Sequence, residues 1–171
     1  MDTKINIIYE DNHLLVVEKP VNIPVQKDES NDPDMLGILK DYIKKTYNKP
    51  GNVYLGLVHR LDRPVGGLMV FAKTSKAASR LSDQIRRRDF KKVYLAVVHG
   101  TPAEKAGTLR HWLLKDESTN MVRVVKGGNK EAKEAVLDYE VIDSNSGFSL
   151  VRINLHTGRP HQIRVQFSAI G

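Results

Sequence analysis

A short polar run in the middle of the chain, His59-Arg60-Leu61-Asp62, carries side chains that acid-base or nucleophilic chemistry uses. Asp62 has an arginine nearby on each side, and Gly66-Gly67 lets the backbone turn sharply soon afterwards. Catalytic residues are often found on connections of this kind, where a rigid scaffold positions them. The same pattern also fits an aspartate that is solvated or that caps a turn, so the local sequence leaves both interpretations open.

Two further segments contain residue types that could belong to a site. In Lys91 to Val98 a period of two places Tyr94 on the opposite face from Val93 and Leu95, and Tyr94 by itself fits a core residue equally well. The segment Leu155 to Arg164 concentrates polar side chains where a strand ends and a helix begins. That density suggests contact with an anion or a substrate. A polar turn whose side chains are satisfied within the protein is the alternative.

The elements that position these residues follow from hydrophobic patterning. In the first half, the apolar runs predict strands, and Asp32-Pro33 has the types expected at a helix N-cap and first helical position. A second helix is expected to be capped by Thr74 or Ser75 and to end at the cluster Arg86 to Arg88. The strands expected in this half are 5–9, 14–17, 53–58 and 68–72.

The second half is dominated by strand patterns, followed by a final helix after Thr157 to Pro160. Gly127-Gly128-Asn129 and the stretch Ser144 to Gly147 have the turn residues of hairpins. The sequence therefore predicts an α+β fold, with a mixed, mostly antiparallel sheet and a few flanking helices, in a single domain of residues 1–171. The strands expected in this half are 93–98, 108–114, 121–125, 135–142 and 148–155.

Composition restricts the partners and the chemistry. The formal net charge of +7 and a pI near 9.6 favour a polyanionic partner, with nucleic acid first, although such a charge can also simply keep a protein from associating. No cysteine is present, which excludes a disulfide, a thiolate nucleophile and a cysteine-based zinc site. Met1 to Lys4 lacks the basic region followed by an apolar region that is typical of a signal peptide. No apolar stretch approaches the roughly 18 residues of a membrane span. A cytoplasmic protein without membrane association is expected.

Four ordered segments resemble the signature segments of RluA-type pseudouridine synthases, and the stretch Tyr9 to Pro20 is similar to the first hairpin of that family. The resemblance covers nearly the whole chain. The four segments are His59-Arg60-Leu61-Asp62-Arg63-Pro64, Gly67 to Lys73, Lys92-Val93-Tyr94, and Thr157-Gly158-Arg159-Pro160-His161-Gln162-Ile163-Arg164.

The resemblance implies isomerisation of a specific uridine to pseudouridine in structured ribosomal or transfer RNA, without a cofactor or a metal. By this analogy Asp62 is the catalytic carboxylate, either as a nucleophile or as the stabiliser of a glycal-like route. Arg164 pairs with Asp62 and keeps it ionised, and Tyr94 stacks on the uracil and could take the C5 proton. Arg60 would occupy the space left by the flipped base. Further RNA contacts are expected from Arg63, Lys73, Arg159, His161 and Gln162.

The sequence also departs from the family pattern. Val65-Gly66 replaces a usual Thr-Ser pair, and Gln166 stands where a histidine is common. The chain stops where the family continues, so we expect a catalytic domain that is C-terminally incomplete, with no separate N-terminal RNA-binding domain. A monomer without an obligate protein partner is expected. The alternative is a catalytically inactive RNA-binding fragment of the same fold.

Three other enzyme classes fit less well. A kinase needs a glycine-rich phosphate loop and an Asp-Phe-Gly segment, which this chain lacks. His156 and His161 do not form the His-Glu-x-x-His arrangement of a zinc hydrolase. A glycosidase that works with two carboxylates is disfavoured, because the signature segments contain one acidic residue.

Overall fold

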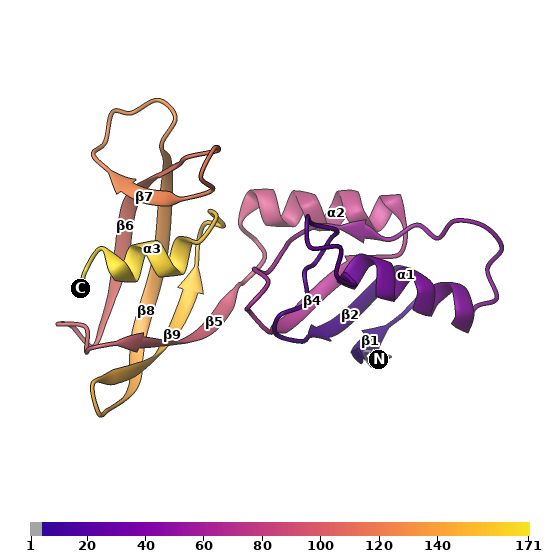
Figure 1. Ribbon diagram of the computed structural model, residues 1–171, viewed down its shortest axis with the longest axis horizontal. Coiled ribbons are helices and arrows are strands. Elements are labelled where there is room, and N and C mark those ends of the chain that lie inside the picture. The colour runs from indigo at the N-terminus through magenta and orange to yellow at the C-terminus, as the bar shows by residue number, and fades with distance from the viewer. Residues whose placement is uncertain (1–4) are drawn as a thin grey trace. The chain divides into compact units, whose positions relative to one another are not determined.

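The computed structural model describes residues 5–171 (Figure 1). The chain divides into two compact units, one ending at Arg87 and the other running from Arg88 to Gly171; we call them unit 1 and unit 2. Met1 to Lys4, on which the expectation of no signal peptide depends, lies outside the described residues. No helix within residues 5–171 is long and apolar enough to cross a membrane.

Unit 1 contains a four-stranded sheet in which every pairing is antiparallel. Its strands are β1 (Asn6–Glu10), β2 (Leu14–Lys19), β3 (Gly56–Leu57) and β4 (Gly67–Ala72), in the order β1-β2-β4-β3. The predicted first hairpin is confirmed, and its turn is closed by the backbone N–H groups of His13 and Leu14, which donate to the Asp11 carboxylate over 2.7 and 2.6 Å. The strand expected over 53–58 is reduced to the two residues of β3.

Helix α1 (Met35–Thr46) covers the buried face of this sheet. Its Met35, Leu39 and Ile43 pack against Leu15 and Val17 of β2 and against β4. The helix begins later than expected. Its N-cap is Asp34, whose side chain accepts a hydrogen bond from the backbone N–H of Gly37 at 3.1 Å, and the predicted N-cap was Asp32.

Helix α2 (Ser75–Arg87) confirms its predicted start, because the Thr74 hydroxyl accepts a hydrogen bond from the Ala77 N–H at 3.2 Å. Ala77 is the one residue of α2 in the buried class. The outward residues are mainly polar and basic, so most of this helix surface is presented to solvent or to a charged ligand.

Unit 2 contains a five-stranded antiparallel sheet in the order β5-β9-β8-β6-β7. The hairpin predicted at Ser144 to Gly147 is confirmed: Asn145 pairs with Phe148, and Ser146 and Gly147 both have positive φ, as a two-residue hairpin turn requires. The hairpin predicted at Gly127-Gly128-Asn129 is wrong, because β8 pairs with β6 instead of β7. The strands are β5 (Val93–His99), β6 (Ala106–Lys115), β7 (Val122–Val125), β8 (Lys133–Asn145) and β9 (Phe148–Leu155).

Helix α3 (Gln162–Ser168) lies on one face of this sheet, as Figure 1 shows. Phe167 of α3 is in the core with Leu137 and Ile153, and Ile163 packs against the same cluster. Trp112 is on β6, opposite Val125 of β7, and is 41% exposed. The predicted α+β class is therefore confirmed, with one sheet and at least one covering helix in each unit.

Candidate active site

Asp62 lies in the connection between β3 and β4 of unit 1 and begins a tight turn. The backbone N–H of Val65 donates to the Asp62 carbonyl at 2.9 Å, which closes the turn over Arg63 and Pro64. Before the turn, the Nε2 atom of His59 accepts a hydrogen bond from the Val70 N–H at 3.1 Å. The backbone on both sides of Asp62 is thus fixed to the sheet, which is the kind of rigid support that a catalytic carboxylate needs.

Lys19, which was not among the predicted site residues, supports this turn through hydrogen bonds to its backbone. The Nζ atom of Lys19, at the end of β2, donates to the backbone carbonyls of Arg63 at 3.0 Å and Val65 at 2.7 Å. Lys19 is 1% exposed. The sequence did contain a signal, because Lys19 follows Leu15 and Val17 at a spacing of two and therefore belongs to the buried face of its strand.

Arg63, expected to contact RNA, is bound to an acidic loop of unit 1. Its guanidinium forms an ion pair with Asp32 and donates to the Ser30 hydroxyl at 3.0 Å, and Asp28 lies 3.6 Å away. The Arg63 side chain is 41% exposed. Exposed pairs of this kind contribute little to stability and are readily exchanged for other anions. The position is therefore compatible with a phosphate contact that replaces the loop carboxylates.

Lys73, also expected to contact RNA, is instead engaged inside unit 1. Its Nζ atom is 2.6 Å from the Glu10 carboxylate and 4.6 Å from the centre of the Tyr47 ring, and its side chain is 8% exposed. Tyr42 and Tyr47 both donate to Glu10 at 2.8 Å. A cation that is so enclosed and paired is not presented to a phosphate. In this structure Lys73 therefore contributes to the stability of the fold, and the RNA contact expected of it stays a prediction.

The Glu10–Lys73 pair predicts a pH dependence of stability. Burial raises the pKa of Glu10, but the hydrogen bonds from Lys73 and the two tyrosines outweigh it, so that the pKa lies below its usual value. Burial lowers the pKa of Lys73, but its hydrogen bonds to Glu10 and Tyr47 bring it above the usual value. Glu10 therefore stabilises the fold above its unfolded pKa of about 4.3, and Lys73 does so below about 10.4.

Glu10→Gln should lower the free energy of unfolding by roughly 3 kcal/mol at neutral pH, because Lys73 is left charged and without its carboxylate. The difference from wild type should shrink as the pH falls through the folded-state pKa of Glu10. Urea denaturation followed by circular dichroism at several pH values measures it. Glu117→Gln, which breaks the exposed Lys115–Glu117 pair, is the control and should change nothing measurable. A pH-independent difference would contradict the assignment.

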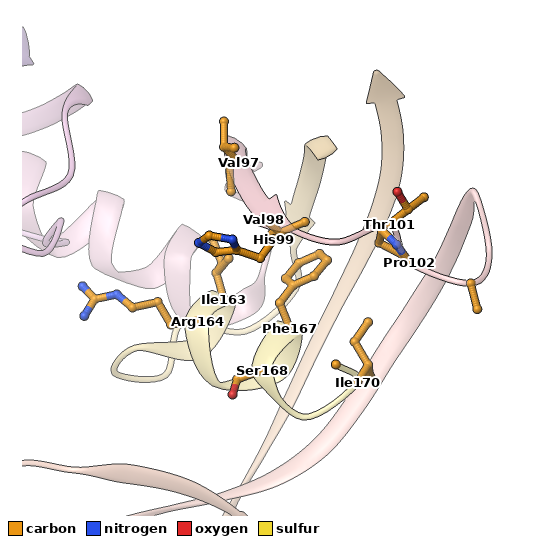
Figure 2. Close-up of a pocket in the computed structure, with 13 residues that line it drawn as sticks. Val97, Val98, His99, Thr101, Pro102, Ile163, Arg164, Phe167, Ser168 and Ile170 are labelled. Atoms are coloured by element: carbon orange, nitrogen blue, oxygen red, sulfur yellow. The ribbon is translucent and has the colours of Figure 1, made fainter. Parts of the chain in front are cut away.

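Tyr94 and Arg164 both belong to unit 2, on the face of the sheet that carries α3. Tyr94 of β5 packs against the core cluster, whereas Val93 and Leu95 are exposed on the other face, as the period of two predicted. Arg164 is exposed on α3. Figure 2 shows Ile163 and Phe167 of the same helix pointing toward the end of β5.

This region is hollowed into a mainly apolar pocket of about 570 Å³, and Arg164 forms part of its rim. Beside Arg164, its lining includes Val98, His99, Ile163, Phe167 and Ile170.

A buried polar network fastens α3 to the sheet. The Thr157 hydroxyl accepts from the Val136 N–H at 2.9 Å and donates to the Gln162 carboxamide at 2.8 Å. Gln162 in turn donates to Gln166 at 2.9 Å and to the Val136 carbonyl at 3.1 Å. Gln166 donates to the carbonyls of Leu109 and Ala135 at 3.1 and 3.2 Å.

This network includes Gln162, which was expected to contact RNA. Its side chain is 3% exposed and its polar atoms bind other groups of unit 2, so it offers no atom to RNA in this structure. In this structure the Gln162 side chain supports α3, and the RNA contact expected of it stays a prediction. The signal that could have revealed the network is the spacing of four between Gln162 and Gln166, which places both on the buried face of one helix.

Basic side chains cluster where β5 begins in unit 2. Burial lowers the pKa of Lys92, and the positive charges of Arg88 and Arg159 lower it further. Three cations that repel one another are stabilised by a bound anion. The Arg159 Nε atom donates to the Glu134 carbonyl at 2.9 Å, which orients the guanidinium. In unit 1, by contrast, Arg86 and Arg87 both form ion pairs with Asp83.

The predicted site residues are thus divided between the two units. Asp62, Arg60 and Arg63 share one connection of unit 1, with Arg60 exposed. Unit 2 holds Tyr94 together with the segment that carries Arg159, His161 and Arg164. The pairing of Asp62 with Arg164 joins one residue from each unit and stays a prediction.

Comparison with known proteins assigns the family. The model of the family described as RNA pseudouridylate synthase matches residues 13–169. The chain therefore belongs to the RNA pseudouridylate synthase family, and the resemblance to RluA-type enzymes is confirmed.

Individual relatives agree. An uncharacterized RNA pseudouridine synthase of Bacillus subtilis, YhcT, is 34% identical over 98% of this chain and 55% of its own length. Ribosomal large subunit pseudouridine synthase D of Pseudomonas aeruginosa is 35% identical over 99% of this chain and 51% of its own. The chain thus spans about half the length of the curated relatives it matches.

Solved structures support the fold. Human RNA Pseudouridylate Synthase Domain Containing 4 has a TM-score of 0.81 and 26% identity, and the match covers 96% of this chain and 64% of the human chain. Human RNA Pseudouridylate Synthase Domain Containing 1 has a TM-score of 0.77 over 100% of this chain and 67% of the human one. At 22% identity the second match bears on the fold alone.

Proposed function

We propose that this chain isomerises specific uridines to pseudouridine in structured RNA, with Asp62 as the catalytic carboxylate. The observation that carries the proposal is the family match over residues 13–169, which includes the Asp62 segment. Ribosomal RNA is the first substrate to test, because a relative covering 99% of this chain is named a ribosomal large subunit enzyme. Residues 1–171 would act together as the catalytic domain, with unit 1 and unit 2 both contributing.

The chemistry assigns distinct tasks to three side chains. The bond between ribose C1′ and uracil N1 breaks, the uracil turns, and a bond from C1′ to C5 forms, after which C5 loses its proton and N1 gains one. Asp62 either attacks C1′ or promotes a glycal-like route. Arg164 would keep Asp62 ionised, and Tyr94 would stack on the uracil. An unperturbed phenol is a weak base near neutral pH, so stacking is the firmer role for Tyr94.

RNA binding would depend mainly on phosphate contacts, with the cluster of Arg88, Lys92 and Arg159 as its centre in unit 2. These contacts position the RNA without reading its sequence. A uridine inside a helix must leave its stack at a cost of a few kcal/mol, and Arg60, which is exposed beside Asp62, would fill the space that the base leaves. Arg63 would exchange its acidic loop for a phosphate, and His161 remains a proposed RNA contact.

The test is release of tritium from C5. Ribosomal and transfer RNA transcripts that carry tritiated uridine are incubated with the protein, and label in the water is counted. We expect release from at least one transcript, reaching a plateau that corresponds to one or a few uridines per molecule. RNA binding without release from any transcript would contradict the enzymatic proposal. It would support an inactive RNA-binding fragment, which is the alternative because the chain spans about half of its relatives.

A further inference from the structure

Trp112 is a large aromatic side chain that the proposed reaction does not use. It is 41% exposed, on the face of the unit 2 sheet opposite α3, because the adjacent His111 points the other way and lies 3.1 Å from Gln166 of α3. Tyr94 and Arg164 lie on the α3 face of the same sheet. Trp112 therefore belongs to a different surface of unit 2 from these two proposed site residues.

The surroundings of Trp112 leave its indole ring accessible. A Cβ atom at Gly127 would lie 3.4 Å from the indole Nε1 atom and 3.7 Å from Cδ1, so any side chain at this position would cover part of the ring. At Gly128, whose φ is +100°, a Cβ atom would enter open space. Both glycines follow β7, which is the edge strand of the sheet (Figure 1). The indole thus stands beside an open, glycine-lined stretch at the sheet edge.

Basic side chains surround this ring. Arg110 precedes Trp112 by two residues on β6 and therefore shares its face. Arg123 of β7 is on the same face, because its partner on β6 is Leu114, and Lys126 directly follows β7. All three basic residues are exposed. An aromatic ring among exposed cations is typical of surfaces that bind single-stranded nucleic acid, with a base on the ring and phosphates on the cations.

The carboxylates that β8 presents on this face are each bound to a basic side chain. The pairs are Glu134 with Arg110, Asp138 with His156, and Glu140 with Arg152. Asp138 also accepts a hydrogen bond from the Thr108 hydroxyl at 2.7 Å. Arg123 and Lys126 lie outside these three pairs, so their charge is available to a phosphate. The electrostatics around Trp112 therefore favour a polyanion.

We propose that Trp112, Arg123 and Lys126 form a binding surface for an unpaired segment of the RNA substrate, on the face of unit 2 opposite α3. One base stacks on the indole, and the adjoining phosphates lie against the two cations. The identity of the ligand as RNA rests on the proposed function. Tryptophan and arginine are also common at protein interfaces, so a protein partner is the outcome that the test must separate.

The experiment compares one RNA hairpin with blunt ends and the same hairpin with a short 3′ extension of adenosines, which stack but are not uridines. Wild type should bind the extended RNA roughly tenfold more tightly, which is the effect of one stacked base. Trp112→Ala should lose this advantage and bind the blunt hairpin within about twofold of wild type, because its phosphate contacts are intact. Trp112→Phe should retain part of the advantage. Leu95→Ala, which removes another exposed apolar side chain from the same face, is the control and should match wild type.

The emission of Trp112 reports the contact directly, because the sequence contains one tryptophan. A base stacked on the indole should quench its emission and shield it from acrylamide. We expect both effects with the extended RNA at saturation and neither with the blunt hairpin. Unchanged emission together with unchanged acrylamide quenching would overturn the proposal and leave this face to a protein partner. The measurement uses the wild-type protein, so it decides the question even if Trp112→Ala does not fold.

The salt dependence of binding tests the role of the cations. Each phosphate contact to a single strand contributes about 0.7 to the slope of log affinity against log salt concentration. Arg123→Gln should make this slope shallower by about that amount for the extended RNA and leave the slope for the blunt hairpin unchanged. Equal slopes for the extended RNA in variant and wild type would overturn the phosphate contact that the proposal assigns to Arg123.

The tritium assay separates this surface from the proposed activity. If the wild-type protein releases no tritium, the isomerase proposal fails, whereas quenching of Trp112 by the extended RNA still supports the binding surface. If the protein is active, Trp112→Ala should raise KM for a transcript with an unpaired flank and leave kcat unchanged. A fall in kcat with KM unchanged would overturn the proposal, because Trp112 would then act on the chemical step.

Discussion

Asp62→Asn should abolish tritium release from every transcript that the wild-type protein modifies. The amide has the shape of the carboxylate but no negative charge, so it can neither attack C1′ nor support a glycal-like route. RNA affinity should remain within about twofold, because phosphate contacts supply most of the binding and Asp62 makes none of them. Single-turnover assays and filter binding, both at one fixed salt concentration, measure the two quantities.

The matched control for this variant is Asp41→Asn, an exposed aspartate of α1 in the same unit. It changes the net charge by the same amount and should keep full activity. Two results would refute the role of Asp62. One is residual turnover comparable to that of the control, and the other is a loss of RNA affinity equal to the loss of activity, which would make Asp62 a binding residue.

Gln166→Leu should lower the free energy of unfolding of unit 2 by about 3 kcal/mol or more. The leucine has nearly the same size, but it leaves the carbonyls of Leu109 and Ala135 and the donor of Gln162 without their partner. Each unsatisfied buried polar group costs about 1 to 3 kcal/mol. Gln166 is 0% exposed, so water cannot replace the lost hydrogen bonds without a local rearrangement. Urea denaturation followed by circular dichroism gives the difference.

Ser168→Ala on the same helix is the control for Gln166→Leu and should be within about 0.5 kcal/mol of wild type, because Ser168 is exposed. A loss below about 1 kcal/mol in Gln166→Leu would show that the network is less important than its geometry indicates. Since α3 also carries Arg164, we expect the variant to lose activity before it loses its fold.

Local patterns predicted the elements that have strong periodicity. The alternation in β2, β5 and β9 follows from side chains that must reach the core of their own unit, and the structure has these strands where they were expected. Aspartate is a good N-cap at either position, and the N-cap of α1 is Asp34 instead of Asp32, directly before the buried Met35. Boundaries of this kind depend on tertiary contacts.

Strand pairing was harder to predict than strand location. Gly127-Gly128-Asn129 has the composition of a hairpin turn, yet β8 passes β7 and pairs with β6. In the observed register Ala135 and Leu137 of β8 are both buried. Nothing in the turn residues encodes this long-range preference. Similarly, β3 is short although its apolar run is longer.

The candidate site shows the same difference between residues that local motifs reveal and residues that depend on long-range contacts. The Asp62 segment was found from its motif, whereas the residues that support it were not. Lys73 was expected to contact RNA because it ends one of the segments that resemble the family, and its partner Glu10 is far away in the chain. Lys19 and Gln166 were missed for a related reason: a polar side chain on a buried face becomes meaningful only when its acceptors, on distant segments, are known.

Trp112 is the single tryptophan of the chain, and it lies on β6 of unit 2. Its fluorescence therefore reports the unfolding of unit 2 alone, while unit 1 contributes only tyrosines to the emission. Denaturation curves from tryptophan emission and from circular dichroism coincide if the two units unfold in one cooperative step, and separate if they unfold in turn. In the second case a variant of unit 1 such as Glu10→Gln would leave the emission curve unchanged, so one optical signal assigns each stability defect to its half of the chain.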